Sequence, residues 1–579
     1  MKACDFIVKY ITEVAGIKHV FTFAGGTSAM ILDSMVRHGG IKIIPMRHEE
    51  NVALAADGYA RIKRNFGLAL TMSGPGATNM ITGIAQSYFD SSPVFYLTGN
   101  VTTNTYKYDL PLRQKGYQET DIVSLVKPIT KNAFYVDQIG RVASVLRTAL
   151  RECISERMGP CLYDIPFDTQ KLEVDDVEMS VAFKYITKTS LSKDEYSKFT
   201  ELLNVAKRPL LLVGGGIQVS GTSSKLISFV RKFKLPVVAS LLGKDAFPND
   251  DPLYVGFIGS YGNRNANRIL DAADLVIALG TRIDSRQTAN LKDFVRNKKI
   301  IHIDVDRNVL GSTINPTLGI NMDLNDFFRD FEKFEEIFPI KGETSSLWLS
   351  SIKKVYELLK ENDLENNYKL NPKKFLRNLS LACPPGTIYT VDVGSHQMWS
   401  AQSFVLKEGD RVLYSGGLGT MGYAIPAAIG ATFASWGTQV ISVVGDGGFQ
   451  MSIPELQTIN EFKLPIKIVV MNNGILGLMK NFQDENFNGR YPATVTGYSV
   501  PDIGKIAKAY DLAYASISKD DQVEEGIEWL LQQSSPAILE VKVPSECGPY
   551  PKVLPGGGLD KQYPPLFDEL ELAVKKELQ

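Results

Sequence analysis

The sequence predicts an α/β protein built from three doubly wound parallel-sheet domains. Short apolar runs of strand length alternate with amphipathic helical patterns along most of the chain, the pattern of sheets covered by helices on both faces. The 579 residues also exceed what one hydrophobic core organises. We therefore expect domains at residues 1–180, 195–340 and 373–545, followed by a C-terminal lid or tail at 546–579.

The apolar runs that predict strands occur in all three expected domains. In the first domain they are GLALTMS (67–73) and PVFYLTGN (93–100). In the second they are PLLLVGGG (209–216), LPVVAS (235–240), LVIALGTR (275–282) and IIHIDVD (300–306). In the third, QVISVV (439–444) and IKIVVM (466–471) flank a helical pattern and so predict a strand–helix–strand unit. The polar stretch 184–198 and the charged helical stretch 343–372 predict linkers.

Composition excludes several classes of protein. The net charge is −1, with 44% apolar and 22% charged residues, so nothing indicates binding to nucleic acid or to an anionic membrane. The five cysteines are scattered and odd in number, which argues against a disulfide framework and favours a reducing cytoplasm. The N-terminus carries no signal-peptide pattern, and no apolar run reaches membrane-spanning length.

Asp446 and Asn473 each follow one strand of the strand–helix–strand unit. Both side chains are therefore expected at the carboxyl edge of one parallel sheet, where such folds bind ligands. A carboxylate and an amide oxygen suit a hard divalent cation, and the glycines beside Asp446 let backbone N–H groups approach a phosphate. GDG alone is a common turn and NN a common strand end, so the prediction depends on both motifs occurring at this spacing.

This segment resembles the thiamine diphosphate (ThDP) signature, in which GDG is followed at a fixed distance by NN. The whole chain resembles the large subunit of acetolactate (acetohydroxyacid) synthases, within the ThDP-dependent decarboxylase and carboligase superfamily. The motifs that carry the resemblance are RHEENVALAADGYAR (47–61), SGPGATN (73–79), GYQETDIV (116–123), VGSHQMW (393–399), SGGLGTMGYAIPAAIG (415–430) and NFNGRY (486–491). The resemblance implies a pyrimidine-binding first domain, a central domain and a diphosphate-binding third domain. It also implies a homodimer or homotetramer, because domains of two subunits together hold the cofactor.

The resemblance assigns roles to residues around ThDP. Glu49 of the RHE motif is the acid expected to activate the aminopyrimidine, although its local sequence alone favours a surface carboxylate at a helix start. The Gly419 carbonyl is expected to accept from the 4′-amino group of the cofactor, and Met421 is expected between its two rings, where a flexible methionine suits the gap. Pro75 and Asn79 match pyrimidine-side positions. The expected diphosphate contacts are Gly394, Ser395, His396, Gly445, Gly447 and Gly448.

Two further cofactors are implied by the resemblance. Mg²⁺ is expected on Asp446, Asn473 and the carbonyl oxygen of Ile475. FAD is expected in the central domain, in a structural role, because carboligation requires no hydride transfer. A vestigial or ADP-type site is the alternative to FAD. The expected FAD contacts are Gly215, Gly216, Ser240, Leu241, Arg282, Asp284, Asp304 and Asp323.

The resemblance also implies the reaction. The enzyme is expected to decarboxylate pyruvate and to transfer the two-carbon unit to a second 2-keto acid, with Gln118 orienting substrate and Arg286 receiving the acceptor carboxylate. Ser395 departs from the family pattern at the diphosphate, where Gln is usual, and three positions depart from it at the substrate, namely Tyr117, Phe167 and Phe482. The three substrate positions motivate an alternative, transfer to another ketone such as a keto-sugar nucleotide. A non-catalytic ThDP-binding paralogue is a minor alternative, and the sequence leaves open whether a regulatory subunit binds.

The Gly/Pro-rich segment 549–565 precedes a last amphipathic helix. It resembles the family's C-terminal segment, which folds over the cofactor, and a closing lid would exclude water from a reactive carbanion. A disordered linker is the alternative that composition leaves open.

Overall fold

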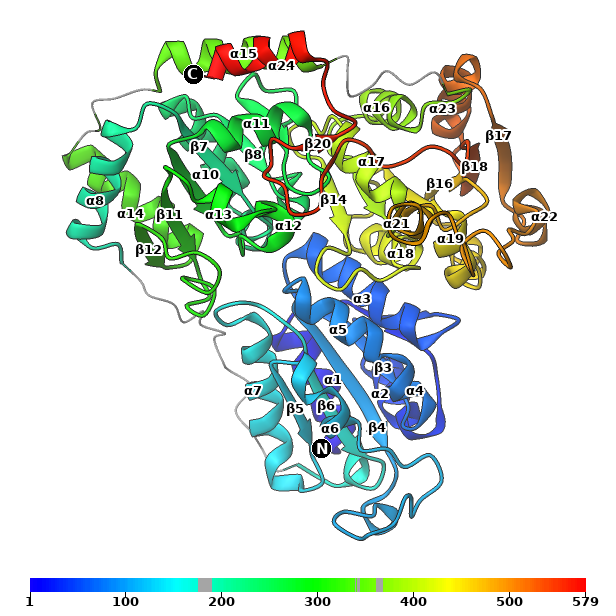
Figure 1. Cartoon of the computed structure of the whole chain (residues 1–579). Helices are drawn as coiled ribbons and strands as arrows, with labels where there is room; N and C mark the ends of the chain where they lie inside the picture. The colour runs from blue at the N-terminus through cyan, green and yellow to red at the C-terminus, as the bar shows by residue number, and fades with distance from the viewer. Residues whose placement is uncertain (175–189, 339, 341–343, 361–367, 579) are drawn as a thin grey trace.

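The computed structural model describes residues 1–174, 190–338, 340, 344–360 and 368–578 (Figure 1). Within these residues the chain forms three six-stranded sheets and one short two-stranded sheet. Every pairing inside the three large sheets is parallel. The predicted α/β class with three doubly wound parallel sheets is therefore confirmed.

The N-terminal sheet has the strand order β2-β1-β3-β4-β6-β5. Its strands are β1 (His19–Thr22), β2 (Lys42–Pro45), β3 (Gly67–Thr71), β4 (Val94–Asn100), β5 (Asn132–Tyr135) and β6 (Cys161–Pro166). Its helices are α1 (Ala3–Lys9), α2 (Ala29–His38), α3 (Glu49–Lys63), α4 (Pro75–Asn79), α5 (Ile81–Phe89), α6 (Ile122–Val126) and α7 (Val142–Ile154). Separate hydrophobic cores on the two faces contain Leu70 and Ala69, neighbours in β3, so the sheet is buried on both sides.

The central sheet has the order β12-β11-β10-β7-β8-β9. Its strands are β7 (Pro209–Val213), β8 (Val237–Ala239), β9 (Tyr254–Phe257), β10 (Leu275–Leu279), β11 (Lys299–Asp304) and β12 (Leu318–Asn321). Its helices are α8 (Lys193–Val205), α9 (Gly216–Val219), α10 (Ser223–Phe233), α11 (Arg264–Ala272), α12 (Ser285–Thr288), α13 (Leu291–Phe294) and α14 (Leu324–Ile337), with the 3₁₀ turn η7 (Leu241–Gly243) after β8.

The C-terminal sheet has the order β14-β13-β15-β16-β18-β17. Its strands are β13 (Ile388–Val391), β14 (Arg411–Tyr414), β15 (Val440–Gly445), β16 (Lys467–Asn472), β17 (Ala513–Ile517) and β18 (Ala537–Lys542). Its helices are α16 (Pro372–Ala382), α17 (Ser395–Ser403), α18 (Ala424–Ala434), α19 (Asp446–Ser452), α20 (Glu455–Glu461), α21 (Gly477–Phe487), α22 (Ile503–Ala509) and α23 (Val523–Gln532). The runs 439–444 and 466–471 thus form adjacent strands, as their pattern predicts.

Both linker predictions are wrong in part. Residues 193–198 begin α8, because Ser192 and Glu195 form a capping box that starts a helix there. Residues 184–189 of the same stretch lie outside the described residues. In the second stretch, α15 (Ser346–Leu359) packs on the central domain, where the buried Trp348 indole donates to the Pro209 carbonyl at 3.1 Å.

The C-terminal residues return to the central domain. A two-stranded antiparallel hairpin, β19 (Lys552–Val553) and β20 (Gln562–Tyr563), precedes α24 (Asp568–Leu578), which lies beside α15 (Figure 1). Glu571 of α24 pairs with Arg268 at 2.5 Å, and Val574 is fully buried. The disordered-linker alternative is therefore wrong for the hairpin residues.

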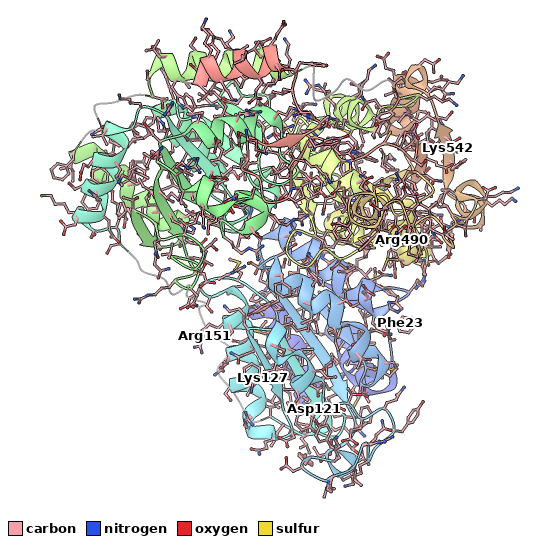
Figure 2. All side chains as sticks on the ribbon, in the orientation of Figure 1. Phe23, Asp121, Lys127, Arg151, Arg490 and Lys542 are labelled. Carbon is pink, nitrogen blue, oxygen red and sulfur yellow. The ribbon has the colours of Figure 1, made fainter. Side chains whose placement is uncertain are left out.

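The N-terminal and C-terminal domains meet through α3 and α18 (Figure 1). A Cβ on Gly430 would lie 1.9 Å from the Ala55 carbonyl oxygen, and one on Gly58 would lie 2.4 Å from that of Ala427. The two helices therefore approach so closely that only glycine fits at these positions. Figure 2 shows side chains on the surface of this assembly, including Phe23 beyond β1 and Arg490 beyond α21. In the described part of the chain, no helix is both long and apolar enough to cross a membrane.

Candidate functional site

Glu49 is the first residue of α3 and is buried, with 5% of its surface exposed. His48 starts the helix, because its side chain accepts from the Glu50 backbone N–H at 3.3 Å. The Asn79 side-chain amide donates to Glu49 Oε2 at 2.9 Å. The surface alternative for Glu49 is therefore wrong, and Asn79 fixes one carboxylate oxygen while Oε1 faces the glycine turn that begins α4. Pro75 is the first residue of that helix, and a Cβ on Gly76 would lie 3.6 Å from Glu49 Oε1.

Gln118 lies at the same sheet edge. Its φ of +64° is a left-handed conformation, and a Cβ on Gly74 would lie 3.0 Å from Gln118 Cβ. The neighbouring Glu119 accepts from the backbone N–H groups of Lys107 and Lys115, both at 2.6 Å, which organises the preceding loop. Tyr117, by contrast, is 86% exposed. The chain thus brings Gln118 against the turn that precedes Pro75, but leaves Tyr117 in solvent.

Phe167 follows β6, and its backbone N–H donates to the Asn100 carbonyl at 2.9 Å. The Lys171 ammonium lies over the Phe167 ring, 4.2 Å from its centroid, so a cation is present beside this position. Asp164, in β6, accepts from Thr98 Oγ1 and Asn100 Nδ2, both at 2.6 Å. Burial raises the pKa of Asp164 to about 7.

Asp446 and Asn473 meet at the carboxyl edge of the C-terminal sheet, as predicted. Asp446 Oδ2 accepts from the backbone N–H groups of Asn473 and Gly474 at 2.9 and 3.0 Å. Tyr498 donates its hydroxyl to Asp446 Oδ1 at 2.5 Å. Burial raises the pKa of Asp446. Ile475 follows in the same turn, where its N–H donates to Asn473 Oδ1 at 3.3 Å. Asp446 and Asn473, the two side chains expected to bind a hard cation, are therefore brought together at one turn.

The expected diphosphate residues surround this turn. A Cβ on either Gly394 or Gly445 would lie 2.8 Å from His396 Cε1, so two glycines make room for one imidazole. Burial lowers the pKa of His396 to about 3. Among the described residues, neither His396 Nε2 nor Ser395 Oγ has a hydrogen-bond partner, although both atoms are buried. Buried polar atoms left without partners are costly, and a phosphate group would satisfy them, so the donor set fits a diphosphate.

The glycine loop that carries Gly419 and Met421 is held by Asp392. Its carboxylate accepts from the backbone N–H groups of Gly422 and Ala424, both at 2.9 Å. The same carboxylate excludes any side chain at Gly448, whose Cβ would lie 2.4 Å from Asp392 Oδ1. Met421 Cε would lie 3.1 Å from a Cβ on Gly447, so Met421 reaches the Asp446 turn.

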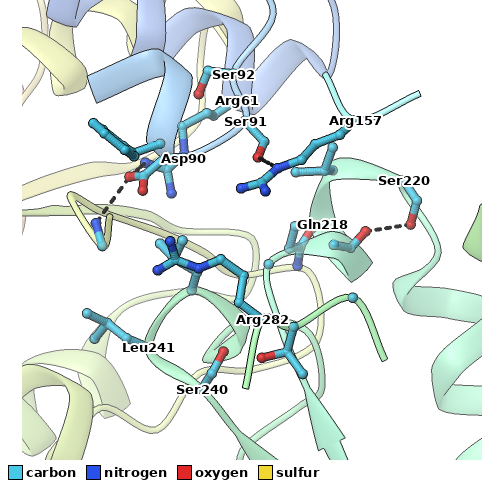
Figure 3. Close-up of a pocket in the computed structure, with 18 of the residues that line it drawn as sticks. Arg61, Asp90, Ser91, Ser92, Arg157, Gln218, Ser220, Ser240, Leu241 and Arg282 are labelled. Atoms are coloured by element: carbon cyan, nitrogen blue, oxygen red, sulfur yellow. Dashed lines mark hydrogen bonds and ion pairs between the residues drawn. The ribbon is translucent and has the colours of Figure 1, made fainter. Parts of the chain in front are cut away.

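A large cavity lies where the three domains meet (Figure 3). It measures about 1670 Å³, including space open to solvent. All eight residues expected to contact a dinucleotide line it, namely Gly215, Gly216, Ser240, Leu241, Arg282, Asp284, Asp304 and Asp323. Gly216 allows the close approach of two loops, since its Cβ would lie 2.7 Å from Gly280 Cα. Burial raises the pKa of Asp304 to about 6.

Arg286 also lines this cavity, on an exposed part of its rim. Its backbone carbonyl accepts from the Ser260 N–H at 2.7 Å. Phe482, on α21, is 49% exposed. The residues expected to contact substrate therefore lie on three domains, and one chain does not enclose them in a single pocket of described residues.

Four residues around these sites were not predicted from the sequence. Tyr498 and Asp392 bind the Asp446 turn and the glycine loop, whereas Arg157 and Asp90 bring the N-terminal domain to the cavity. Arg157 donates to Ser91 at 2.9 Å (Figure 3) and pairs with the Asp306 carboxylate at 3.3 Å. Asp392 alone had a sequence signal, because it directly follows a strand-like apolar run.

Comparisons with known proteins agree with this arrangement. Three family models match the chain: "Thiamine pyrophosphate enzyme, N-terminal TPP binding domain" at residues 1–125, the central domain of such enzymes at 196–331, and the C-terminal TPP binding domain at 392–541. A probable acetolactate synthase large subunit of Methanocaldococcus jannaschii is 34% identical over 100% of this chain and 97% of its own. Acetolactate synthase isozyme 3 large subunit of Escherichia coli is 32% identical over 97% and 98%. An acetolactate synthase of Arthrospira platensis is 33% identical over 93% and 94%.

Proposed function

The chain belongs to the acetolactate synthase large-subunit family of thiamine pyrophosphate enzymes, and from this premise we propose its reaction. The enzyme decarboxylates pyruvate and transfers the remaining two-carbon unit to a second 2-keto acid. The relatives carry the name acetolactate synthase, and they therefore do not favour transfer to another kind of ketone or a non-catalytic role.

One observation carries this proposal. Next to the Asp446–Asn473 pair, the buried atoms Ser395 Oγ and His396 Nε2 have no partner among the described residues. A site with two oxygen ligands for a divalent cation and two unsatisfied polar atoms beside a glycine turn suits a metal-bound diphosphate. Mg²⁺ would be held by Asp446, Asn473 and the Ile475 carbonyl, which neutralises the charge that the phosphates bring into a buried region.

ThDP supplies, when bound, a carbanion that adds to a ketone carbon and an electron sink for decarboxylation. The protein holds a proton in place for that chemistry. Glu49 Oε1 is the atom expected to share a proton with a ring nitrogen, because Asn79 already occupies Oε2 at 2.9 Å. Glu49 is 5% exposed, so few water molecules compete with a ring nitrogen for this carboxyl group.

Substrate binding falls to residues at the edges of three domains. Arg286 is expected to hold the carboxylate of the acceptor, since a guanidinium group binds a carboxylate in a two-pronged geometry. Gln118, fixed against Gly74, is expected to orient a carbonyl group. The Lys171 ammonium over Phe167 keeps a positive charge where the family usually has lysine after DIP, which favours entry of an anionic keto acid.

We propose that two copies of the chain complete the site. Tyr117 is 86% exposed and Phe482 is 49% exposed, so two side chains expected at the substrate face solvent in a single chain. Glu49 and Asp446 also belong to different domains, and a second copy would place one against the other. Several relatives are named large subunits, so we further propose that a smaller chain binds this one.

The described cysteines are all free and buried, which favours a cytoplasmic location.

FAD is proposed for the cavity at the domain junction. All eight expected contacts line that cavity, and Asp304 and Asp323 offer carboxylates for ribose hydroxyls. A structural role is expected, because the proposed reaction involves no net oxidation. Anaerobic pyruvate should therefore leave the flavin absorbance unchanged, whereas bleaching during turnover would indicate an oxidase.

The proposed function is tested by Glu49→Gln, compared with Glu50→Gln in the adjacent residue. The first variant should bind ThDP but exchange the C2 proton with deuterated water at least 100-fold more slowly, since general acid–base catalysis contributes about 10²–10⁴-fold. The second should exchange at the wild-type rate. Wild-type exchange in Glu49→Gln would remove Glu49 from its role.

A further inference from the structure

The loop Ser415–Gly422, which carries Gly419 and Met421, is also held from another domain. Asp90, at the end of α5 in the N-terminal domain, accepts from the backbone N–H groups of Gly416 at 3.1 Å and Gly417 at 2.7 Å. Gln86, one turn earlier, accepts from Ser415 Oγ at 2.6 Å and donates to Asp90 at 2.6 Å. Gln86 is fully buried and Asp90 is 6% exposed, so water does not compete for these hydrogen bonds.

The first residues of the loop pack closely against two neighbouring elements. A Cβ on Gly417 would lie 2.6 Å from Phe89 Cβ, and one on Gly416 would lie 2.6 Å from Leu242 Cγ. The start of the loop thus lies between α5 and η7 of the central domain, whereas Leu418 and Gly419 are exposed. Asp90, Leu242 and Gly416 line the cavity at the domain junction, and Figure 3 shows Asp90 and Leu241 on different domains around it.

We propose that Gln86 and Asp90 are positioning residues, which hold the Ser415–Gly422 loop in the conformation that ThDP needs, and that a dinucleotide in the cavity strengthens this hold. A ligand packed against Leu241, Leu242 and Asp90 restricts both elements against which the start of the loop packs. FAD should therefore tighten the binding of ThDP, and by linkage ThDP should tighten the binding of FAD by the same factor. The inference rests on the proposed function, because it assigns ThDP to the loop and FAD to the cavity.

Asp90→Asn tests the positioning role. The asparagine side chain of this variant would have one oxygen to accept from the N–H groups of Gly416 and Gly417, and its NH₂ group would face other donors. The variant therefore loses part of the hydrogen bonding that fixes the loop. In hydrogen exchange, peptides covering the Ser415–Gly422 loop should exchange faster than in the wild type. Calorimetry with Mg²⁺ present should give a Kd for ThDP about tenfold weaker, and FAD should no longer change it.

Two further variants separate positioning from general destabilisation. Gln86→Glu combined with Asp90→Asn restores a donor and an acceptor between the two side chains, and should recover part of the ThDP affinity. Asp245→Asn is the matched control, because Asp245 also lines the cavity and accepts from Arg411 Nε at 2.9 Å and the Val412 N–H at 3.0 Å. It should lower thermal stability without faster exchange in the loop.

The outcomes distinguish the inference from the proposed function. The positioning role would be overturned if Asp90→Asn kept the wild-type rate of hydrogen exchange in the loop and the wild-type Kd for ThDP. It would also be overturned if Asp245→Asn raised the exchange rate of the loop as much as Asp90→Asn does. FAD that binds the wild type without changing the Kd of ThDP would overturn the coupling. If the wild-type protein binds no FAD, both the proposed FAD site and its coupling to ThDP are wrong. Hydrogen exchange of the loop in Asp90→Asn would still decide the positioning role. Failure of the wild type to bind ThDP would contradict the proposed function itself.

Discussion

Removing one hydroxyl group, by Tyr498→Phe, should weaken the binding of Mg²⁺. Asp446 Oδ2 is held by two backbone N–H groups, whereas Oδ1 is held by the Tyr498 hydroxyl. A carboxylate oxygen has two lone pairs, so Oδ1 can accept from Tyr498 and still coordinate a cation. Tyr498 therefore fixes the orientation of the carboxylate for the metal, although it is not itself a ligand.

The size of the effect follows from the contacts. A hydrogen bond to a charged group contributes about 1.5–3 kcal/mol. Because 1.4 kcal/mol corresponds to a tenfold change, the Kd for Mg²⁺ should rise by roughly 10- to 100-fold, in the range found for groups that orient metal ligands. The variant is smaller by one oxygen atom, and Tyr498 is partly exposed, so the fold should be retained.

The assay is calorimetric titration of Mg²⁺ into protein with saturating ThDP, at fixed pH and ionic strength. Tyr491→Phe is the matched control, since the Tyr491 hydroxyl donates to the Asp484 carboxylate on α21, away from Asp446. The control should bind Mg²⁺ as the wild type does. Tighter Mg²⁺ binding in Tyr498→Phe would contradict this role of Tyr498, because it would mean that the hydroxyl competes with the cation for Oδ1.

Three more predictions follow from the same contacts. Burial raises the pKa of Asp164 to about 7 from 3.8, so between these pH values the folded chain binds more protons than the unfolded chain, and its stability falls as pH rises. The denaturant midpoint of the wild type should therefore fall across this pH range, and Asp164→Asn should make that dependence weaker. An unchanged pH dependence in Asp164→Asn would contradict this assignment. Mixing inactive Glu49→Gln chains with inactive Asp446→Asn chains should restore activity, since each hybrid dimer retains one intact site; no recovery would place both residues of a site in one chain. Lys552 pairs with Glu485 of α21, so Lys552→Met should loosen the C-terminal hairpin and raise the ratio of acetaldehyde to ligated product; a constant ratio would exclude a lid.

The buried central strands could be predicted from the sequence because they are continuous apolar runs. The strands β3, β4, β7 and β10 lie within predicted runs, β15 and β16 extend one residue past theirs, and all six are almost wholly buried. The edge strands β2 and β5 were not predicted, because each has four residues and is partly exposed. The buried strands β6, β13 and β18 were not predicted either. The helix at 193–198, which was predicted as a linker, does have a signal in the sequence, because Ser192 and Glu195 match the pattern of a capping box.

The site could be predicted in part. Asp446 and Asn473 each follow an apolar run, so the geometry of a parallel sheet brings them together. The burial of Glu49 could not be predicted from RHEEN, because it depends on Asn79, thirty residues away in another helix. The hydrogen bond between Asp90 and Gly416 joins two domains and two residues that are 326 positions apart in the sequence, so no local sequence pattern predicts it.

Product analysis with labelled pyruvate decides whether the enzyme transfers the two-carbon unit to a second 2-keto acid. Purified enzyme with ThDP, Mg²⁺ and FAD would receive pyruvate alone, and then pyruvate with added ketone acceptors. Pyruvate alone should yield labelled CO₂ and labelled acetolactate, and both should be lost when ThDP is omitted. Release of CO₂ with no acetolactate above background, but with a labelled adduct of another ketone, would contradict transfer to a 2-keto acid.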